Sequence, residues 1–130
     1  MAGRILIVGN DEDLIAIVRH HLVTQGHEVL HTLDGTEGPV IAMRELPDLV
    51  ISDTCMSDCD GFAQAAELRL ESSLHALPII LLTKAGDPGV LARADRFGVK
   101  HCLPKPVARD ALLAAVASSL RQRTGCGASL

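Results

Sequence analysis

The sequence predicts an α/β fold, a single doubly wound parallel sheet of five strands in the order 2-1-3-4-5 with helices on both faces. Three short apolar runs, at residues 5–8, 49–51 and 79–82, indicate the central strands. Each run is rich in branched aliphatic residues and bounded by polar or turn residues, as expected for strands covered on both faces. Two more polar runs, at 28–32 and 100–103, are typical of edge strands.

Apolar residues that recur every three or four positions predict the helices between these strands. The stretches 36–45 and 62–70 also contain helix formers, although Gly38 and Pro39 must fit into the first turn of the earlier one. Asp87-Pro88 is a favourable helix start, with an N-cap residue before a proline. The apolar stripes are Leu14, Val18 and Leu22; Val90, Ala94 and Phe97; and Leu112, Val116 and Leu120.

The chain of 130 residues is expected to form one domain over residues 1–122, followed by a flexible tail or linker stub at 123–130. The tail, from about Arg121, contains Gly125 and Gly127 and is expected to fray. No apolar run reaches the roughly 20 residues that a membrane span needs, and no signal peptide is recognisable. We therefore expect a cytoplasmic protein.

Composition argues against several functions. The net charge is −4, the basic residues are scattered, and there is no Trp or Tyr, so direct nucleic-acid binding is disfavoured. The four cysteines lack C-x-x-C spacing and are expected to be free thiols. The six histidines lack the spacing of metal pairs and are interpreted as structural or solvent-facing.

Polar residues follow three of the predicted strands where each strand ends. Asp53 ends the third, Thr83-Lys84 ends the fourth, and Lys105 follows the fifth between two prolines. Ligands of such sheets gather beyond the carboxyl ends of the strands. We therefore expect a carboxylate, a hydroxyl and an ammonium group to converge there.

These residues stand in segments that resemble the response-regulator receiver domain, a flavodoxin-like signalling module of the chemotaxis type. The resemblance runs from about residue 4 to residue 120. Residues 47–53, followed by Met56 and Asp60-Gly61, resemble the strand whose last Asp accepts phosphate. Residues 78–83 resemble the strand that ends in the switch Thr, and residues 103–106 resemble the segment whose Lys-Pro bond is often cis.

The resemblance implies a two-component phosphorelay. A histidine kinase or phosphotransfer protein would pass a phosphoryl group to Asp53, with Mg²⁺, Lys105 and Thr83 at the phosphoryl oxygens. Thr83 would then move and reshape the face formed by the helix near residues 90–97, the strand at 100–103 and the helix near 112–120. That face would bind an output protein, an output domain or a second copy. The domain would not be an enzyme beyond phosphorylating itself from a phosphodonor and dephosphorylating itself.

The metal site departs from the family pattern. Gly9 and Asn10 stand where receivers usually carry two acidic residues, so we expect weakened Mg²⁺ binding, because this ion prefers carboxylate oxygens. The remaining ligands would be Asp53, the Asn10 amide oxygen and the backbone carbonyl of Cys55. Asp11 could substitute if the loop shifts by one residue, but its simpler interpretation is an acidic residue at a helix N-terminus.

Other departures concern the switch. Cys102 occupies the position of the usual aromatic residue, Lys84 follows Thr83 where a small residue is common, and Ser57 replaces the usual proline after Met56. Lys84 could crowd the pocket or supply a second cation. With fewer carboxylates to compete for it, Lys105 could pair directly with Asp53.

Three alternatives remain open from the sequence. The domain could be a pseudo-receiver, a protein-interaction module that needs no phosphate. It could be an FMN enzyme, although Asp11, Glu12 and Asp13 would repel the phosphate. An aspartate phosphatase is disfavoured because Asp53 lacks an acidic residue two positions on. A redox or metal cluster of Cys55, Cys59 and Cys102 is less expected than packing by small side chains.

Overall fold

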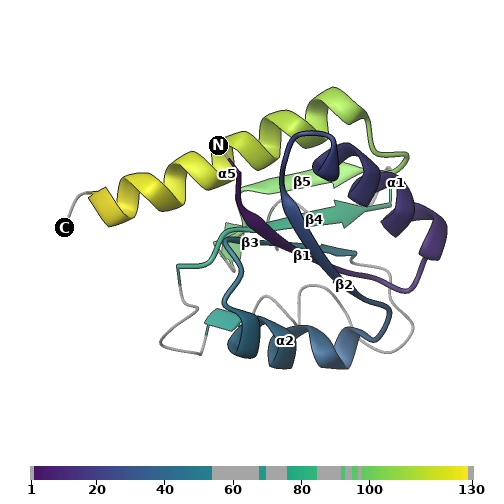
Figure 1. Ribbon diagram of the computed structural model, residues 1–130, viewed down its shortest axis with the longest axis horizontal. Coiled ribbons are helices and arrows are strands. Elements are labelled where there is room, and N and C mark those ends of the chain that lie inside the picture. The colour runs from purple at the N-terminus through teal and green to yellow at the C-terminus, as the bar shows by residue number, and fades with distance from the viewer. Residues whose placement is uncertain are drawn as a thin grey trace.

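The protein is described by a computed structural model that covers residues 2–53, 68–69, 76–84, 92, 95–96 and 98–128, with side chains to residue 121 (Figure 1). Within these residues the chain forms five strands, one 3₁₀ turn and three helices. The strands are β1 (Arg4–Val8), β2 (Glu28–Thr32), β3 (Leu49–Asp53), β4 (Ile79–Thr83) and β5 (His101–Pro104). The helical elements are α1 (Glu12–Val23), η1 (Gly35–Glu37), α2 (Gly38–Glu45) and α5 (Arg109–Ala128).

The sheet has the predicted topology. All neighbouring strands run parallel, in the order β2-β1-β3-β4-β5, with the two more polar strands at the edges. The register pairs Asp53 with Leu82 and Thr83 with Pro104. Parallel strands end on the same side of a sheet, so this register brings the ends of β3, β4 and β5 together. The side of the sheet where the strands end is called its carboxyl edge, and the side where they begin its amino edge.

Helices cover both faces of the sheet, with α1 and α5 on one face and α2 on the other (Figure 1). Ile5 of β1 packs in the same core cluster as Val18 of α1 and Val116 of α5, whereas Leu6 packs with Ala42 of α2. Successive strand residues point to opposite faces. Two buried faces therefore explain why the strands were recognisable as continuous apolar runs.

Helix α2 tolerates its glycine and proline because both lie in its first turn. The Asp34 side chain accepts a hydrogen bond from the backbone N–H of Thr36 at 2.9 Å and so caps the 3₁₀ turn that leads into the helix. Pro39 follows at a position where a helix has no acceptor for a backbone N–H, so its missing donor costs nothing. The helix predicted at residues 36–45 is thus confirmed, with a 3₁₀ first part.

Two boundaries differ from the prediction. Strand β5 begins and ends one residue later than expected, since it extends to Pro104. Helix α5 continues to Ala128, whereas the sequence suggested fraying from about Arg121. Each glycine in this stretch costs a helix only about 1 kcal/mol, which does not by itself end one. The domain boundary at residue 122 stays a prediction.

The two helices predicted at 62–70 and near 90–97 lie largely outside the described residues. Leu68 of the first is described, and its side chain is buried against the α2 side of the sheet. In the described part of the chain, no helix has the length and apolar character that crossing a membrane requires.

The end of α2 is strained at one residue. Leu46 adopts a left-handed conformation, with φ of 47° and ψ of 60°, and its N–H donates to the Ala42 carbonyl at 2.9 Å. A left-handed backbone brings the Cβ atom of an L-residue too close to the carbonyl and costs about 1 kcal/mol. Its side chain is 54% exposed, so packing compensates only partly.

We expect Leu46→Gly to raise the free energy of unfolding by up to about 1 kcal/mol, because glycine removes this strain. Denaturant unfolding measures the change. Gly26→Ala is the matched control, since Gly26 has φ of 87° and open space around it. It should lower the unfolding free energy by about 1 kcal/mol through backbone strain alone. A Leu46→Gly protein no more stable than the original would contradict the assignment of strain.

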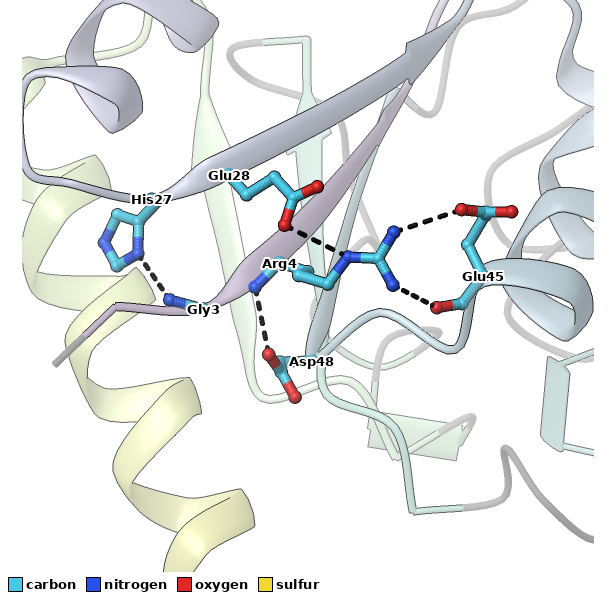
Figure 2. A network of polar contacts seen from close by, with 6 residues as sticks. All are labelled: Gly3, Arg4, His27, Glu28, Glu45 and Asp48. Carbon is cyan, nitrogen blue, oxygen red and sulfur yellow. Dashed lines mark hydrogen bonds and ion pairs between the residues drawn. The ribbon is translucent and has the colours of Figure 1, made fainter.

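The amino edge of the sheet is held by the side chain of Arg4 (Figure 2). Its guanidinium donates to the Glu45 carbonyl at 2.8 Å and to the Glu45 carboxylate at 3.0 Å, and it forms an ion pair with Glu28 at 3.3 Å. The Arg4 backbone N–H donates to the Asp48 carboxylate at 2.9 Å. The hydrogen bonds from Arg44 and Arg4 lower the pKa of the Glu45 carboxyl. One residue thus joins the start of β1 to β2, to the end of α2 and to the turn before β3.

His27 contributes a second link at this edge. Its Nδ1 atom accepts a hydrogen bond from the Gly3 backbone N–H at 3.1 Å, which requires Nδ1 to carry no proton (Figure 2). Burial lowers the pKa of His27 below its ordinary value of 6.5. The folded protein therefore holds this imidazole in its neutral form, consistent with the structural role expected for the histidines.

A histidine whose pKa is lower in the folded state makes stability depend on pH. Its contribution is fully present above the unfolded pKa of about 6.5 and is lost as the pH falls through the lower folded pKa. We expect the unfolding free energy of the wild type to decrease over that interval, and His27→Gln to reduce the slope. His31→Gln, at an exposed histidine of β2, should keep it. Denaturant unfolding at several pH values measures the slopes, and equal slopes for wild type and His27→Gln would contradict the assignment.

Candidate functional site

The site lies where β3, β4 and β5 end. Asp53 is the last residue of β3, Thr83 is the last residue of β4, and Lys105 directly follows β5. The sequence predicted that these three residues gather at one edge, and the structure brings Asp53 and Lys105 into direct contact. Asp53 and Thr83 are both almost fully buried, with 2% and 4% of their surfaces exposed.

Asp53 and Lys105 form a close ion pair in this site. The Lys105 Nζ atom donates to both carboxylate oxygens of Asp53, at 2.7 Å to Oδ1 and 2.8 Å to Oδ2. The Asp53 side chain is 3% exposed and that of Lys105 is 27% exposed. An ionised carboxylate so deeply buried needs a counter-charge, because desolvation penalises an isolated charge heavily. The direct pairing considered from the sequence is thus observed.

Backbone contacts fix the position of Lys105. Its N–H donates to the Thr83 carbonyl at 2.8 Å, which continues the pairing of β4 with β5 by one residue. The peptide bond that follows, to Pro106, is cis, as the resemblance implied. The lysine stem therefore leaves the sheet beside the end of β4 and crosses toward β3.

Thr83 is oriented by the neighbouring strand. Its hydroxyl group donates to the Leu103 carbonyl of β5 at 3.4 Å, a long hydrogen bond. Lys84, the next residue, is exposed. The Thr83 hydroxyl group thus lies at the carboxyl ends of the strands. Replacing its weak hydrogen bond to β5 with one to a stronger acceptor costs little free energy.

Gly9 brings the β1–α1 turn directly against Asp53. It is buried, and a Cβ atom added to it would lie 3.4 Å from the Asp53 Cβ atom and 4.0 Å from Asp53 Oδ2. The sequence identified this glycine only as a missing ligand. Only the three-dimensional structure shows its contact with Asp53, because the turn after β1 and the end of β3 are far apart in the sequence.

Comparison with known proteins decides the family. The sequence model of the response regulator receiver domain family matches residues 5–117 of this chain. Protein PilH of Pseudomonas aeruginosa is 31% identical over 111 residues, which cover 85% of this chain and 92% of PilH. The transcriptional regulatory protein GlrR of Escherichia coli is 35% identical over 120 residues, or 92% of this chain and 27% of GlrR. The chemotaxis response regulator CheY4 of Vibrio cholerae superposes with a TM-score of 0.84 at 28% identity, covering 92% of this chain and all of CheY4.

The chain belongs to the response regulator receiver domain family. Receivers are phosphorylation-accepting signalling domains of two-component systems rather than enzymes in the usual sense. The pseudo-receiver alternative is therefore not favoured, and the FMN-enzyme alternative is not supported. The chain spans about a quarter of the length of GlrR.

Receivers generally bind Mg²⁺ in an acidic pocket beside the acceptor, but the described residues of this receiver do not fit that ion well. Gly9 offers no side-chain ligand, and both oxygens of Asp53 accept hydrogen bonds from Lys105. The described part of the chain contains no group of three His, Cys, Asp or Glu residues able to hold a metal ion. Cys55, whose backbone carbonyl was a predicted ligand, lies outside the described residues.

Asp11, the substitute ligand considered from the sequence, caps helix α1. Its Oδ1 atom accepts hydrogen bonds from the backbone N–H groups of Asp13 at 3.1 Å and Leu14 at 3.2 Å. Such capping contributes about 1 kcal/mol, which turning the side chain toward a metal would forfeit. This geometry favours the helix-start interpretation of Asp11 over the metal-ligand interpretation.

Cys102, which the resemblance placed at the usual aromatic position, packs as a small apolar residue. It lies opposite Leu81 in the register and contacts the core cluster on the α2 side of the sheet. Burial raises the pKa of its thiol, which keeps the reactive thiolate form scarce. This supports the packing interpretation for Cys102, whereas Cys55 and Cys59 lie outside the described residues.

We expect the Asp53–Lys105 pair to show a coupling energy of about 1–3 kcal/mol in unfolding, below the range of fully buried pairs because Lys105 is partly exposed. The cycle compares Lys105→Met, Asp53→Asn and the double variant by urea denaturation at neutral pH. Lys105→Met alone should be the most costly, since it leaves the buried carboxylate without its ammonium partner. The control cycle uses the exposed Arg109–Asp110 pair and should give under about 0.5 kcal/mol. Similar coupling in both cycles would contradict this account.

Proposed function

We propose that Asp53 is the phosphoacceptor of this receiver. An Asp53 carboxylate oxygen would attack the phosphorus of a phosphohistidine on a histidine kinase or phosphotransfer protein. The phosphorus–nitrogen bond breaks, its electron pair returns to the imidazole, and an acyl phosphate forms on Asp53. The observation that carries the proposal is the buried Asp53 carboxylate held by Lys105 at the carboxyl edge of the sheet.

Lys105 and Thr83 are proposed to bind the phosphoryl oxygens. The Lys105 ammonium already lies 2.7 Å from Asp53 Oδ1, so it can follow the negative charge as it moves onto the phosphoryl group. The Thr83 hydroxyl can exchange its long bond to the Leu103 carbonyl for a charged phosphoryl oxygen, a stronger acceptor. Lys84 is proposed as a further cation at the phosphoryl group. Asp53, Asn10 and the Cys55 carbonyl are proposed to hold a Mg²⁺ ion too weakly for saturation at millimolar concentrations.

The movement of Thr83 is proposed to act on the surface beside it. Thr83 bonds to β5, so its release would alter the contacts of β5 and the neighbouring α5. Cys102 lies in this strand without the aromatic ring of other receivers, so the change would pass through backbone and small side-chain movements. The face of β5, α5 and the helix expected before β5 is the proposed contact for an output protein, an output domain or a second copy.

The reactions, location and attached domain of this receiver are also proposed. Self-phosphorylation from small phosphodonors and self-dephosphorylation are the expected reactions. The cytoplasmic location and the lack of direct nucleic-acid binding rest on the sequence and its net charge of −4. GlrR is a transcriptional regulatory protein, and matching about a quarter of it is compatible with a receiver that controls an attached domain.

Incubation with phosphoramidate, followed by intact mass measurement, tests the proposal. We expect one phosphoryl group to be gained by the wild type and none by Asp53→Asn. Asp110→Asn, which changes a carboxylate that is 97% exposed, should behave as the wild type. The reaction is run both with Mg²⁺ and with EDTA, so that a metal requirement cannot hide the acceptor. Absence of phosphorylation under both conditions, or its persistence in Asp53→Asn, would refute Asp53 as the acceptor.

A further inference from the structure

We propose that two lysines, Lys105 and Lys84, take the place of the divalent cation in this receiver, so that phosphorylation of Asp53 does not require Mg²⁺. The inference rests on the proposed phosphoacceptor role of Asp53 and concerns how its charge is neutralised. It is carried by three observations: the double hydrogen bond from Lys105 to Asp53, the close approach of Gly9, and the register of β4 with β5.

The unphosphorylated site already balances its charges. One buried carboxylate faces one ammonium group at 2.7 and 2.8 Å, so this pair is electrically neutral. A divalent cation that bound Asp53 would have to displace Lys105 or lie beside it, which leaves excess positive charge in a buried place. Additional carboxylates would offset that charge, but Gly9 has no side chain to supply one. The resting site therefore gives a divalent cation little to bind.

Lys84 lies at the same edge of the sheet as Lys105. The register pairs Thr83 with Pro104, and the Lys105 N–H bonds to the Thr83 carbonyl. The residues that follow each member of this pair, Lys84 and Lys105, therefore leave two adjacent strands at the same edge of the sheet. Lys84 is exposed, and its flexible stem leaves its ammonium group free to approach an anion at that edge.

The phosphorylated site needs more positive charge than the unphosphorylated one. A phosphoryl group on a side chain carries a charge of about −1.5 to −2 at neutral pH. Lys105 and Lys84 together supply two positive charges, which match it without a metal ion. In the transfer, Asp53 forms a bond to phosphorus, the bond from phosphorus to the donor nitrogen breaks, and that nitrogen takes a proton from water. No metal or redox partner enters this balance.

The first experiment measures the rate of phosphorylation by phosphoramidate, read by intact mass, with Mg²⁺ and with EDTA. The wild-type rates should agree within about twofold, because the lysines rather than a metal ion neutralise the phosphoryl charge. Lys84→Gln should be slower by about tenfold in EDTA, since one of two cations is lost. Lys100→Gln is the matched control, because it removes an exposed lysine just before β5, at the opposite edge of the sheet. It should keep the wild-type rate.

Restoring acidic residues should reverse this behaviour. Gly9→Asp combined with Asn10→Asp should make phosphorylation at least about tenfold faster with Mg²⁺ than with EDTA, because carboxylates recruit the ion. The Gly9 site leaves ordinary contact distance for a Cβ atom. Asn10→Asp alone, at an exposed position, serves if the double variant does not fold. It should show the same change in a weaker form.

Calorimetric titration of Mg²⁺ into the unphosphorylated proteins gives an independent measurement. The wild type should show no saturable heat at millimolar Mg²⁺, and the acidic variants should show it. Saturable Mg²⁺ binding by the wild type, or wild-type phosphorylation that EDTA abolishes, would overturn the lysine replacement while leaving Asp53 as the acceptor. Lack of phosphorylation under every condition would instead overturn the acceptor role and the inference with it.

Discussion

The ion pair between Asp53 and Lys105 joins two parts of the chain that are 52 positions apart, across the end of β4. A carboxylate on a side chain that is only 3% exposed is stable there only while a cation accompanies it. The pair in turn depends on backbone geometry, because the bond from the Lys105 N–H to the Thr83 carbonyl directs the lysine stem toward β3. The contact between Asp53 and Lys105 therefore depends both on the buried charge and on the pairing of β4 with β5.

Gly9 gives this pair a particular character. In receivers with acidic residues in the first turn, the acceptor shares its pocket with other carboxylates, and a divalent ion offsets them. Here Gly9 brings no side chain to Asp53, and Asp11 uses its oxygen to start α1. A smaller negative charge needs a smaller positive one, and one ammonium group is sufficient at rest. The same family fold can thus reach a neutral site by two routes.

The opposite edge of the sheet has its own set of stabilising contacts. Arg4 and His27 join the start of β1 to β2 and to the end of α2, far from Asp53 along the strands. These contacts hold the sheet together without using residues of the carboxyl edge. The chain matches nearly all of PilH but only about a quarter of GlrR.

The sequence by itself determined the sheet, its strand order and the positions of Asp53, Thr83 and Lys105 where β3, β4 and β5 end. Burial on both faces produces continuous aliphatic runs, and the polar residues that follow each run mark the end of the strand. Only the tertiary structure decided what the polar residues do there. That Lys105 contacts both oxygens of Asp53 and that Gly9 lies against Asp53 depend on the register and packing between distant segments. Local patterns carry no record of such contacts, because each is set by the positions of two strands rather than by the residues of one.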